Sequence, residues 1–245
     1  MNQKLTLAKE KLIVALDVDT AEKALDLVKK LSSHAGMFKV GMQLFYSAGP
    51  DVVRRIKEQG VKVFLDLKLH DIPNTVGQAA RALAGLGADI INVHAAGGSA
   101  MMQAAAGAVR ERAATLGLPA PFVISVTVLT SIDRPAFQQE LGFPGEIQEK
   151  VRAWAVLTKE AGLDGVVASP KETAVVREAC GDDFKIITPG IRPAWSVSGD
   201  QKRIMTPGEA IGQGASYLVV GRPITGVGDP AAAAQKILSE MAEGL

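Results

Sequence analysis

The chain has 245 residues, of which 47% are hydrophobic and 22% are charged, enough for a soluble protein with a sizeable core. Its net charge is +1 and its basic residues are spread out, which argues against a face for polymeric nucleic acid but leaves room for a local phosphate site. The one cysteine, Cys180, excludes an intramolecular disulfide and a cysteine-rich metal site. The first residues lack the apolar run of a signal peptide, and no stretch approaches the ~18–20 apolar residues that cross a membrane. We therefore expect a cytoplasmic enzyme.

Short β-branched runs alternate with longer amphipathic, alanine-rich segments along the whole chain. The short runs predict strands near Leu12–Leu16, Met37–Val40, Val61–Leu67, Ile90–Val93, Phe122–Val128, Gly165–Ala168, Phe184–Ile187 and Tyr217–Val220. The longer segments predict helices at Ala21–Leu31, Asp51–Gln59, Thr75–Leu86, Ala100–Leu116, Ile147–Ala161, Lys171–Ala179, Pro207–Gln213 and Pro230–Ala242.

Glycines recur where a predicted helix hands over to a strand, and there they suit a left-handed cap: Gly36, Gly60, Gly87, Gly162 and Gly214. Near-continuous apolar strands that alternate with helices indicate a parallel sheet covered by helices. Eight such units favour a closed (β/α)8 TIM barrel over an open doubly wound sheet, although counting alone does not decide between them. No low-complexity linker divides the chain, so we expect a single domain over residues 1–245.

In a barrel of this kind, chemistry is carried by residues at the carboxyl ends of the strands. The polar residues at those predicted ends are Asp17, Lys39, Asp66, Lys68, Asp71, Asn92, His94, Thr127, Thr130, Thr188, Arg192 and Arg222. We therefore expect charges to be concentrated at one end of the barrel.

Asp66 and Lys68 are two residues apart on a predicted strand, so their side chains point to the same side of the sheet. An isolated Asp-x-Lys is more often a structural ion pair, because buried charges must be paired. Here Asp71 follows closely, and Lys39 and Asp17 end neighbouring strands. Five charges at one mouth favour a functional site.

The segment FLDLKLHDIPNT, Phe64–Thr75, resembles the signature D-x-K-x-x-D-I-x-N-T of the orotidine 5′-monophosphate decarboxylase family. The blocks VALDVDT, FKVG, INVHAAGG, VTVLTS, DGVVAS, TPGIRP, GDQKRIMTP and VVGRPIT resemble that family's blocks in the same order. The resemblance runs from Val14 to the last helix, and no position that the family uses for substrate departs from its pattern.

The resemblance implies decarboxylation of orotidine 5′-monophosphate to uridine 5′-monophosphate and CO2, without a cofactor or a metal. It implies a catalytic charge network of Lys39, Asp66, Lys68 and Asp71, in which Lys68 stabilises charge at C6 and then donates a proton. Asp66 would keep Lys68 charged and oriented beside the departing carboxylate. Asp71 would come from the partner subunit of a homodimer, so that sites are shared across the interface.

The resemblance also implies the groups that bind this small nucleotide. Asp17 and Lys39 would hold the ribose hydroxyls with Thr75 of the partner, and Thr130 would contact the pyrimidine. Gly221 and Arg222 would bind the phosphate. The segment from Pro189 to Gln201 is a candidate lid, from which Arg192 and Gln201 would reach the phosphate or the base.

Three alternatives are weighed against this interpretation. A metal-dependent sugar-phosphate decarboxylase or hexulose-phosphate synthase also carries Asp-x-Lys-x-x-Asp, but it needs an added carboxylate where this chain has Lys39. A catalytically silent nucleotide sensor would lack a member of the charge set, and all are present. Taken singly, Asp17 and Thr130 would be caps, Gly221-Arg222 a closing turn, and His94 a packed, hydrogen-bonded histidine.

Overall fold

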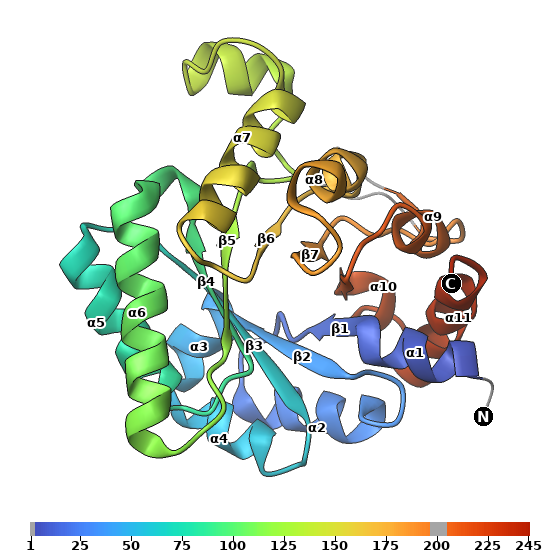
Figure 1. Ribbon diagram of the computed structural model, residues 1–245. Coiled ribbons are helices and arrows are strands. Elements are labelled where there is room, and N and C mark those ends of the chain that lie inside the picture. Colours follow the sequence, from blue (N-terminus) through green and yellow to red (C-terminus); the bar gives the residue numbers. More distant parts are fainter. Residues whose placement is uncertain (1–2, 197–204) are drawn as a thin grey trace.

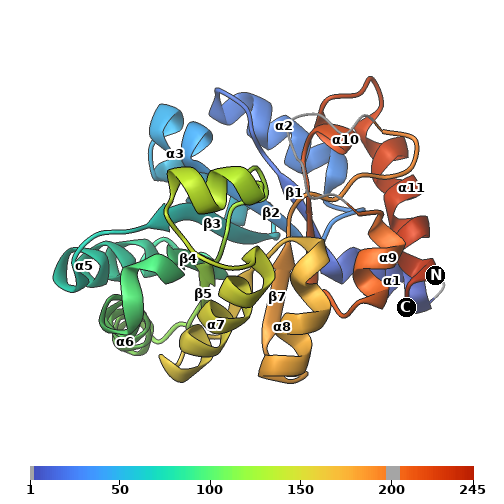
Figure 2. The ribbon, with the colours of Figure 1, turned by 90° about the horizontal axis from the view of Figure 1, so that it is seen from above.

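The computed structural model describes residues 3–196 and 205–245. Within those residues the strands β1 to β8 are all parallel, each pairs with the next, and β8 pairs back to β1, so that they form a closed barrel. Helices lie around the outside of the strands (Figures 1 and 2). The predicted (β/α)8 TIM barrel is confirmed.

The predicted strands agree with the observed ones to within about two residues at either end. The observed strands are β1 (Leu12–Ala15), β2 (Met37–Gly41), β3 (Lys62–Leu69), β4 (Ile90–His94), β5 (Phe122–Val126), β6 (Gly165–Val167), β7 (Lys185–Thr188) and β8 (Tyr217–Val220).

Every predicted helix is present: α2 (Ala21–Leu31), α4 (Asp51–Lys57), α5 (Pro73–Ala84), α6 (Gly98–Leu116), α7 (Ile147–Glu160), α8 (Thr173–Cys180), α9 (Pro207–Gly212) and α11 (Pro230–Glu243). Elements that were not predicted are α1 (Gln3–Lys11), α3 (Met42–Ala48), α10 (Arg222–Thr225), the 3-10 turns η1 (Ala95–Gly97) and η3 (Pro170–Glu172), and the π-helix η2 (Ala136–Glu140). None of the helices in the described part of the chain has the length and apolar character needed to span a membrane.

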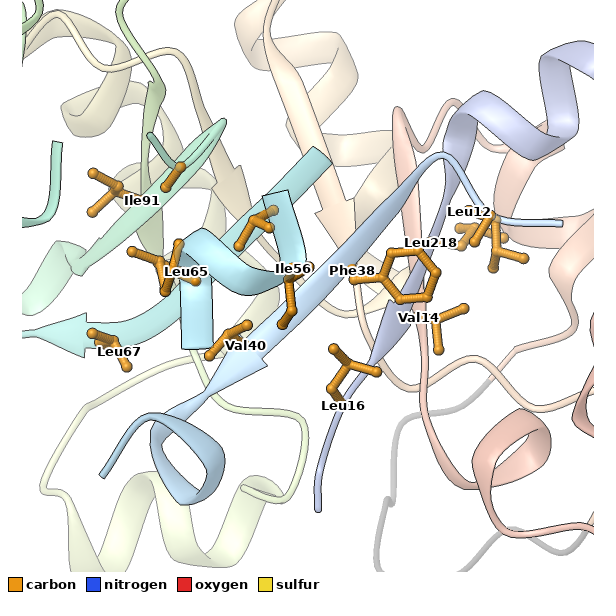
Figure 3. Packing of buried hydrophobic residues seen from close by; sticks show 14 of the residues in the cluster. Leu12, Val14, Leu16, Phe38, Val40, Ile56, Leu65, Leu67, Ile91 and Leu218 are labelled. Carbon is orange, nitrogen blue, oxygen red and sulfur yellow. The ribbon is translucent and has the colours of Figure 1, made fainter. Parts of the chain in front are cut away.

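Side chains alternate along the strands between two buried layers. On β1, Leu12 and Val14 face outward into the layer between strands and helices, where they join Phe38 of β2 and Ile56 of α4 (Figure 3). The intervening Ile13 faces the barrel interior, in a cluster whose other members are Ala15, Met37, Phe64, Ile90, Ile124, Ile187 and Val219. Burial on both faces explains why the strands read as continuous apolar runs.

Polar side chains replace the apolar ones at the next inward positions of three neighbouring strands. Two residues after Met37, Phe64 and Ile90 come Lys39, Asp66 and Asn92. Because side chains alternate with a period of two, all three polar side chains point into the barrel. They lie closer to the carboxyl ends of the strands than the apolar interior cluster does.

The glycines between helices and strands confirm the predicted left-handed caps, with one exception. Gly60, Gly87, Gly162 and Gly214 have positive φ, but Gly36 does not. A Cβ at Gly36 would lie 2.8 Å from the carbonyl oxygen of Lys9 in α1. Gly36 is therefore required by the close approach of α1, a helix that was not predicted, and the left-handed cap expected there is wrong.

Candidate active site

A cavity of about 570 Å³ opens at the carboxyl ends of the strands, a size typical of small-molecule sites. The loop that projects between β5 and α7 (Figure 1) contributes Leu129, Thr130 and Ser131 to its wall. The residues predicted from the sequence that line it are Asp17, Lys39, Asp66, Lys68, Thr130, Pro189, Arg192, Gly221 and Arg222.

Carboxylates and ammonium groups alternate across one wall of this cavity. Lys39 Nζ lies 3.1 Å from Asp17 Oδ1 and 3.3 Å from Asp66 Oδ2. The other oxygen of Asp66, Oδ1, lies 2.7 Å from Lys68 Nζ. The side chain of Lys39 is only 10% exposed and that of Asp66 14%, so the centre of this chain of charges is shielded from water and its attractions are weakly screened.

Lys39 and Asp66, at the centre of this row of charges, each help to keep the other in its charged form. Burial by itself lowers the pKa of Lys39, but the carboxylates of Asp66 and Asp17 outweigh it, and the pKa lies above the ordinary lysine value. Burial raises the pKa of Asp66, but the charges of Lys39 and Lys68, with hydrogen bonds from Lys68 and Asn92, bring it below the ordinary value. Both groups are therefore charged at neutral pH.

Lys68 has an unusual backbone. Among the described residues it is the one non-glycine with positive φ, 53°, a conformation that costs about 1 kcal/mol or more. The pairing of β3 with β4 is interrupted here: Leu65 is opposite Ile91, and the next matched pair is Leu69 with Val93. The predicted convergence of Lys68 and Asp66 is present, but a bulge rather than a regular strand produces it.

The sequence interpretation gave Asn92 no role, although it noted its place at a strand end. Asn92 is fully buried, accepts a hydrogen bond from the Lys68 backbone N–H (2.8 Å) and donates one to Asp66 Oδ1 (2.6 Å). Asn92 follows an inward-facing apolar residue of β4 by two positions, as Asp66 does on β3, and this spacing could have identified Asn92 from the sequence. Gln43 and Ser131 also line the cavity and were not predicted to do so. Gln43 lies in α3, which the sequence interpretation missed.

The far wall is formed by the segments after β7 and β8. Arg222 begins the short helix α10 directly after Gly221, and both line the cavity. Arg192 is 8% exposed, and its backbone N–H donates to the carbonyl of Met205 (3.0 Å). Arg192 is thus anchored where the predicted lid segment meets the barrel, while the predicted Gln201 lies outside the described residues.

Asp71 and Thr75 are not brought to the cavity of their own chain. Both are exposed, and neither lines the cavity. Asp71 Oδ1 instead accepts a hydrogen bond from the backbone N–H of Ile72 (2.6 Å). A contribution of these residues to a neighbouring subunit's site stays a prediction.

The histidine at the end of β4 is packed, as expected. Its ring lies against that of His70, with centroids 5.3 Å apart, and the described residues give it no hydrogen-bond partner, contrary to expectation. Burial, with the nearby His70 and Lys68, lowers the pKa of His94 to about 4. His94 is therefore neutral beside the charge network. In the described residues no group of three or more His, Cys, Asp or Glu side chains is placed to hold a metal ion.

Comparison with known proteins decides the family. Residues 10–237 match the model described as "Orotidine 5'-phosphate decarboxylase / HUMPS family". The chain belongs to this family. Among the curated proteins similar to this chain, the "Orotidine 5'-phosphate decarboxylase" of Moorella thermoacetica is 61% identical over 234 residues, which cover 96% of this chain and 93% of the relative. That of Syntrophomonas wolfei is 52% identical over 237 residues, 96% and 99% of the two chains.

Solved structures of the family agree with the barrel. The orotidine 5′-phosphate decarboxylase of Lactobacillus acidophilus superposes with a TM-score of 0.81 at 43% identity, over 94% of this chain and 98% of that one. The enzyme of Pyrococcus horikoshii gives a TM-score of 0.75 at 29% identity, over 94% and 98%. Because the relatives that match nearly the whole chain carry the decarboxylase name, the sugar-phosphate alternative within the family is not favoured.

Proposed function

We propose that this protein decarboxylates orotidine 5′-monophosphate to uridine 5′-monophosphate and CO2, the last step of de novo pyrimidine nucleotide synthesis, without a cofactor. The observation that carries the proposal is the alternating chain Asp17–Lys39–Asp66–Lys68 on the cavity wall, in a member of a family whose relatives carry this enzyme's name. Catalysis that leaves a localised carbanion needs electrostatic stabilisation arranged before the reaction begins, and such a chain provides it.

In the proposed reaction the bond from C6 to the carboxylate breaks, CO2 leaves, and the electron pair stays on C6. The Lys68 ammonium stabilises that pair and then transfers a proton from Nζ to C6, after which Lys68 regains a proton from solvent. Asp66, 2.7 Å from Lys68 Nζ, keeps the ammonium charged and oriented. Lys39 neutralises the other oxygen of Asp66, so that the network is charged but nearly balanced.

The remaining cavity residues supply substrate binding in this proposal. Asp17 and Lys39 hold the ribose hydroxyls, and Thr130 contacts the pyrimidine. The phosphate lies against Gly221 and Arg222 after β8, the usual phosphate position of these barrels. Pro189, Arg192 and Gln201 belong to the segment that closes over the phosphate and the base, so that phosphate binding energy is used in catalysis.

We propose that the active form is a cytoplasmic homodimer in which the whole chain of each subunit is one barrel domain. Asp71 and Thr75 would complete the partner's site. Their own chain leaves them exposed, and Ile72, which directly follows Asp71, is a large apolar side chain that is 66% exposed and that a partner would cover. A cytoplasmic location fits an enzyme that supplies nucleotide precursors.

The test is to follow the pyrimidine absorbance of orotidine 5′-monophosphate with the purified protein, before and after exhaustive chelation. We expect full activity in both cases, because the ammonium groups of Lys39 and Lys68 supply the positive charge that a metal would otherwise provide. Activity that disappears on chelation and returns with magnesium would favour the metal-dependent sugar-phosphate enzymes. Binding of the nucleotide without turnover would favour the silent sensor.

A further inference from the structure

The bulge in β3 leaves one residue of β4 opposite three residues of its neighbour. Between the matched pairs Leu65–Ile91 and Leu69–Val93, β3 has Asp66, Leu67 and Lys68, whereas β4 has only Asn92. Regular pairing would supply a backbone acceptor on β4 for each N–H of β3 that points toward β4. The bulge removes this backbone acceptor at Lys68, the proposed proton donor.

Asn92 fills the gap with its side chain. Its Oδ1 accepts from the Lys68 backbone N–H, and its Nδ2 donates to Asp66 Oδ1, the same oxygen that receives Lys68 Nζ. A backbone N–H can only donate and an ionised carboxylate can only accept, so the amide has one orientation that satisfies both. Since Asn92 is fully buried, water does not compete for either bond.

We propose that Asn92 is a positioning residue for the decarboxylation: its amide holds the left-handed backbone of Lys68 and the carboxylate of Asp66 in one fixed arrangement. The inference rests on the proposed function. Without Asn92, the Lys68 N–H is left unsatisfied beside a backbone that is already strained. The backbone then relaxes, and the ammonium moves relative to C6, which costs rate more than affinity.

A second consequence concerns the acid side of the pH profile. The titratable groups that face Asp66 are Lys39 from β2, Lys68 from β3 and His94 from β4. Asn92 adds a hydrogen bond that helps to keep the pKa of Asp66 low. A carboxylate with a depressed pKa loses its contribution as pH falls through that pKa. Removing Asn92 raises the pKa, so activity is lost at a higher pH than in the wild type.

The experiment compares Asn92→Ala and Asn92→Asp with the control Ser125→Ala. Ser125 is also fully buried on a barrel strand and loses a 2.6 Å hydrogen bond, to Thr158, when truncated. We expect Asn92→Ala to lower kcat roughly ten- to a hundredfold, with KM changed less than about threefold. Its acid limb should move to higher pH. Ser125→Ala should keep kcat within about twofold and leave the pH profile unchanged.

Asn92→Asp preserves shape and the acceptor for Lys68 but sets a second carboxyl against Asp66. Two carboxyls in contact share a proton, and one pKa of the pair is strongly raised. Its activity should therefore be greatest at low pH and fall as pH rises, the opposite trend to Asn92→Ala. This variant tests the proposal even if Asn92→Ala does not fold. Wild-type kcat and pH profile in either variant would overturn it.

Two measurements without substrate separate this inference from the proposed function. Hydrogen exchange of the Lys68 amide should be at least about tenfold faster in Asn92→Ala than in wild type or Ser125→Ala. The Asp66 carboxyl, followed by NMR, should titrate at higher pH in Asn92→Ala. If the wild type does not decarboxylate orotidine 5′-monophosphate, the proposed function fails. If it does, and neither NMR property changes, the role of Asn92 fails.

Discussion

The two ends of the barrel use the same residue types for different purposes. At the mouth, where the carboxyl ends of the strands lie, Lys68 Nζ is 2.7 Å from Asp66. At the base, where the amino ends of the strands lie, Lys57 Nζ is 2.8 Å from Asp89. Asp89 Oδ2 also accepts the backbone N–H of Val63, 2.7 Å away. At the mouth, the partners that the described residues give to the oxygens of Asp66 are all side chains, and a cavity adjoins them.

The arrangement at the base is repeated around the barrel. The residue before each of β4, β6 and β8 accepts the backbone N–H at the start of the preceding strand: Asp89 from Val63, Asp164 from Val123, and Ser216 from Ile186. These bonds tie neighbouring strands together. The expectation that charge gathers at one end of the barrel is therefore wrong in part, because the base has charges too. Asp66 and Asp89 both have a lysine partner and both line cavities, so the backbone N–H that Asp89 accepts at the start of a strand is what identifies its structural role.

The largest difference in turnover should appear when Lys68 at the mouth and Lys57 at the base are each replaced by alanine. Lys68→Ala should abolish nearly all turnover while the barrel stays folded, because the stabilising charge and the proton donor are lost together. Lys57→Ala should keep kcat and lose roughly 1 kcal/mol or less of stability, because its pair is partly exposed. Steady-state kinetics and urea unfolding measure both. A Lys68→Ala variant with more than about a tenth of normal activity, a loss below ~1.4 kcal/mol, would contradict the proposed mechanism.

The next contrast uses two arginines. Arg222→Ala should lower kcat/KM at least about a hundredfold, roughly 2.7 kcal/mol, because a charge-assisted contact with the phosphate is lost. Added guanidinium ion should restore part of the activity. An equal loss on the substrate without its phosphate would show that Arg222 acts elsewhere.

Arg177, at the base, is the control for Arg222. Its guanidinium donates to backbone carbonyls and a hydroxyl, at Gly181, Asp182, Phe184, Gly214 and Ser216. Arg177→Ala should therefore lower the free energy of unfolding by roughly 3 kcal/mol, and guanidinium should not change its kcat. Thermal or urea unfolding and the same rescue assay distinguish the two arginines.

A subunit-mixing experiment tests whether a second subunit contributes Asp71 to the active site. The expected effect is smaller: activity should return to about a quarter of normal. Lys68→Ala and Asp71→Ala homodimers should each be nearly inactive. After an equal mixture is unfolded and refolded, random pairing makes about half the dimers mixed, and one site in each mixed dimer is intact. The matched control mixes Lys68→Ala with Asp66→Ala, which should regain nothing because both residues belong to one chain's site. Mixed dimers without activity in the first mixture would contradict the placement of Asp71.

The smallest expected effect on turnover comes from the base carboxylate. Asp89→Ala leaves the Val63 N–H and Lys57 without their partner, which should cost about 1–3 kcal/mol of unfolding free energy. The value of kcat should stay within about twofold of wild type, because the substitution is made at the opposite end of the barrel from the cavity. A lower kcat with unchanged stability would mean that the two ends are coupled.

The sequence was sufficient to predict the strands and helices because the evidence for them is local, whereas closure of the barrel depends on the pairing of β1 with β8. Apolar runs bounded by glycine or polar residues predicted β1 to β8 and the main helices, since burial on both faces and helical periodicity each leave a pattern within a few residues. The spacing of Asp66 and Lys68 predicted that their side chains lie on one side of the strand, and the two groups do meet, but the bulge at Lys68 brings them together rather than regular alternation. The charges at other strand ends could be grouped because parallel strands present their carboxyl ends at one rim.

Tertiary structure decided what depends on neighbours distant in sequence. The helix α1 contains Leu5 and Leu7, but Ala8 is its one fully buried residue, so its sequence shows no clear amphipathic pattern. It packs against α11 from the other end of the chain (Figure 1), which no local pattern could predict. Gly36 is needed because α1 approaches it. The left-handed backbone of Lys68 and the double hydrogen bond of Asn92 follow from the register of β3 on β4. Register is a property of two paired strands, and the sequence of either strand alone does not contain it.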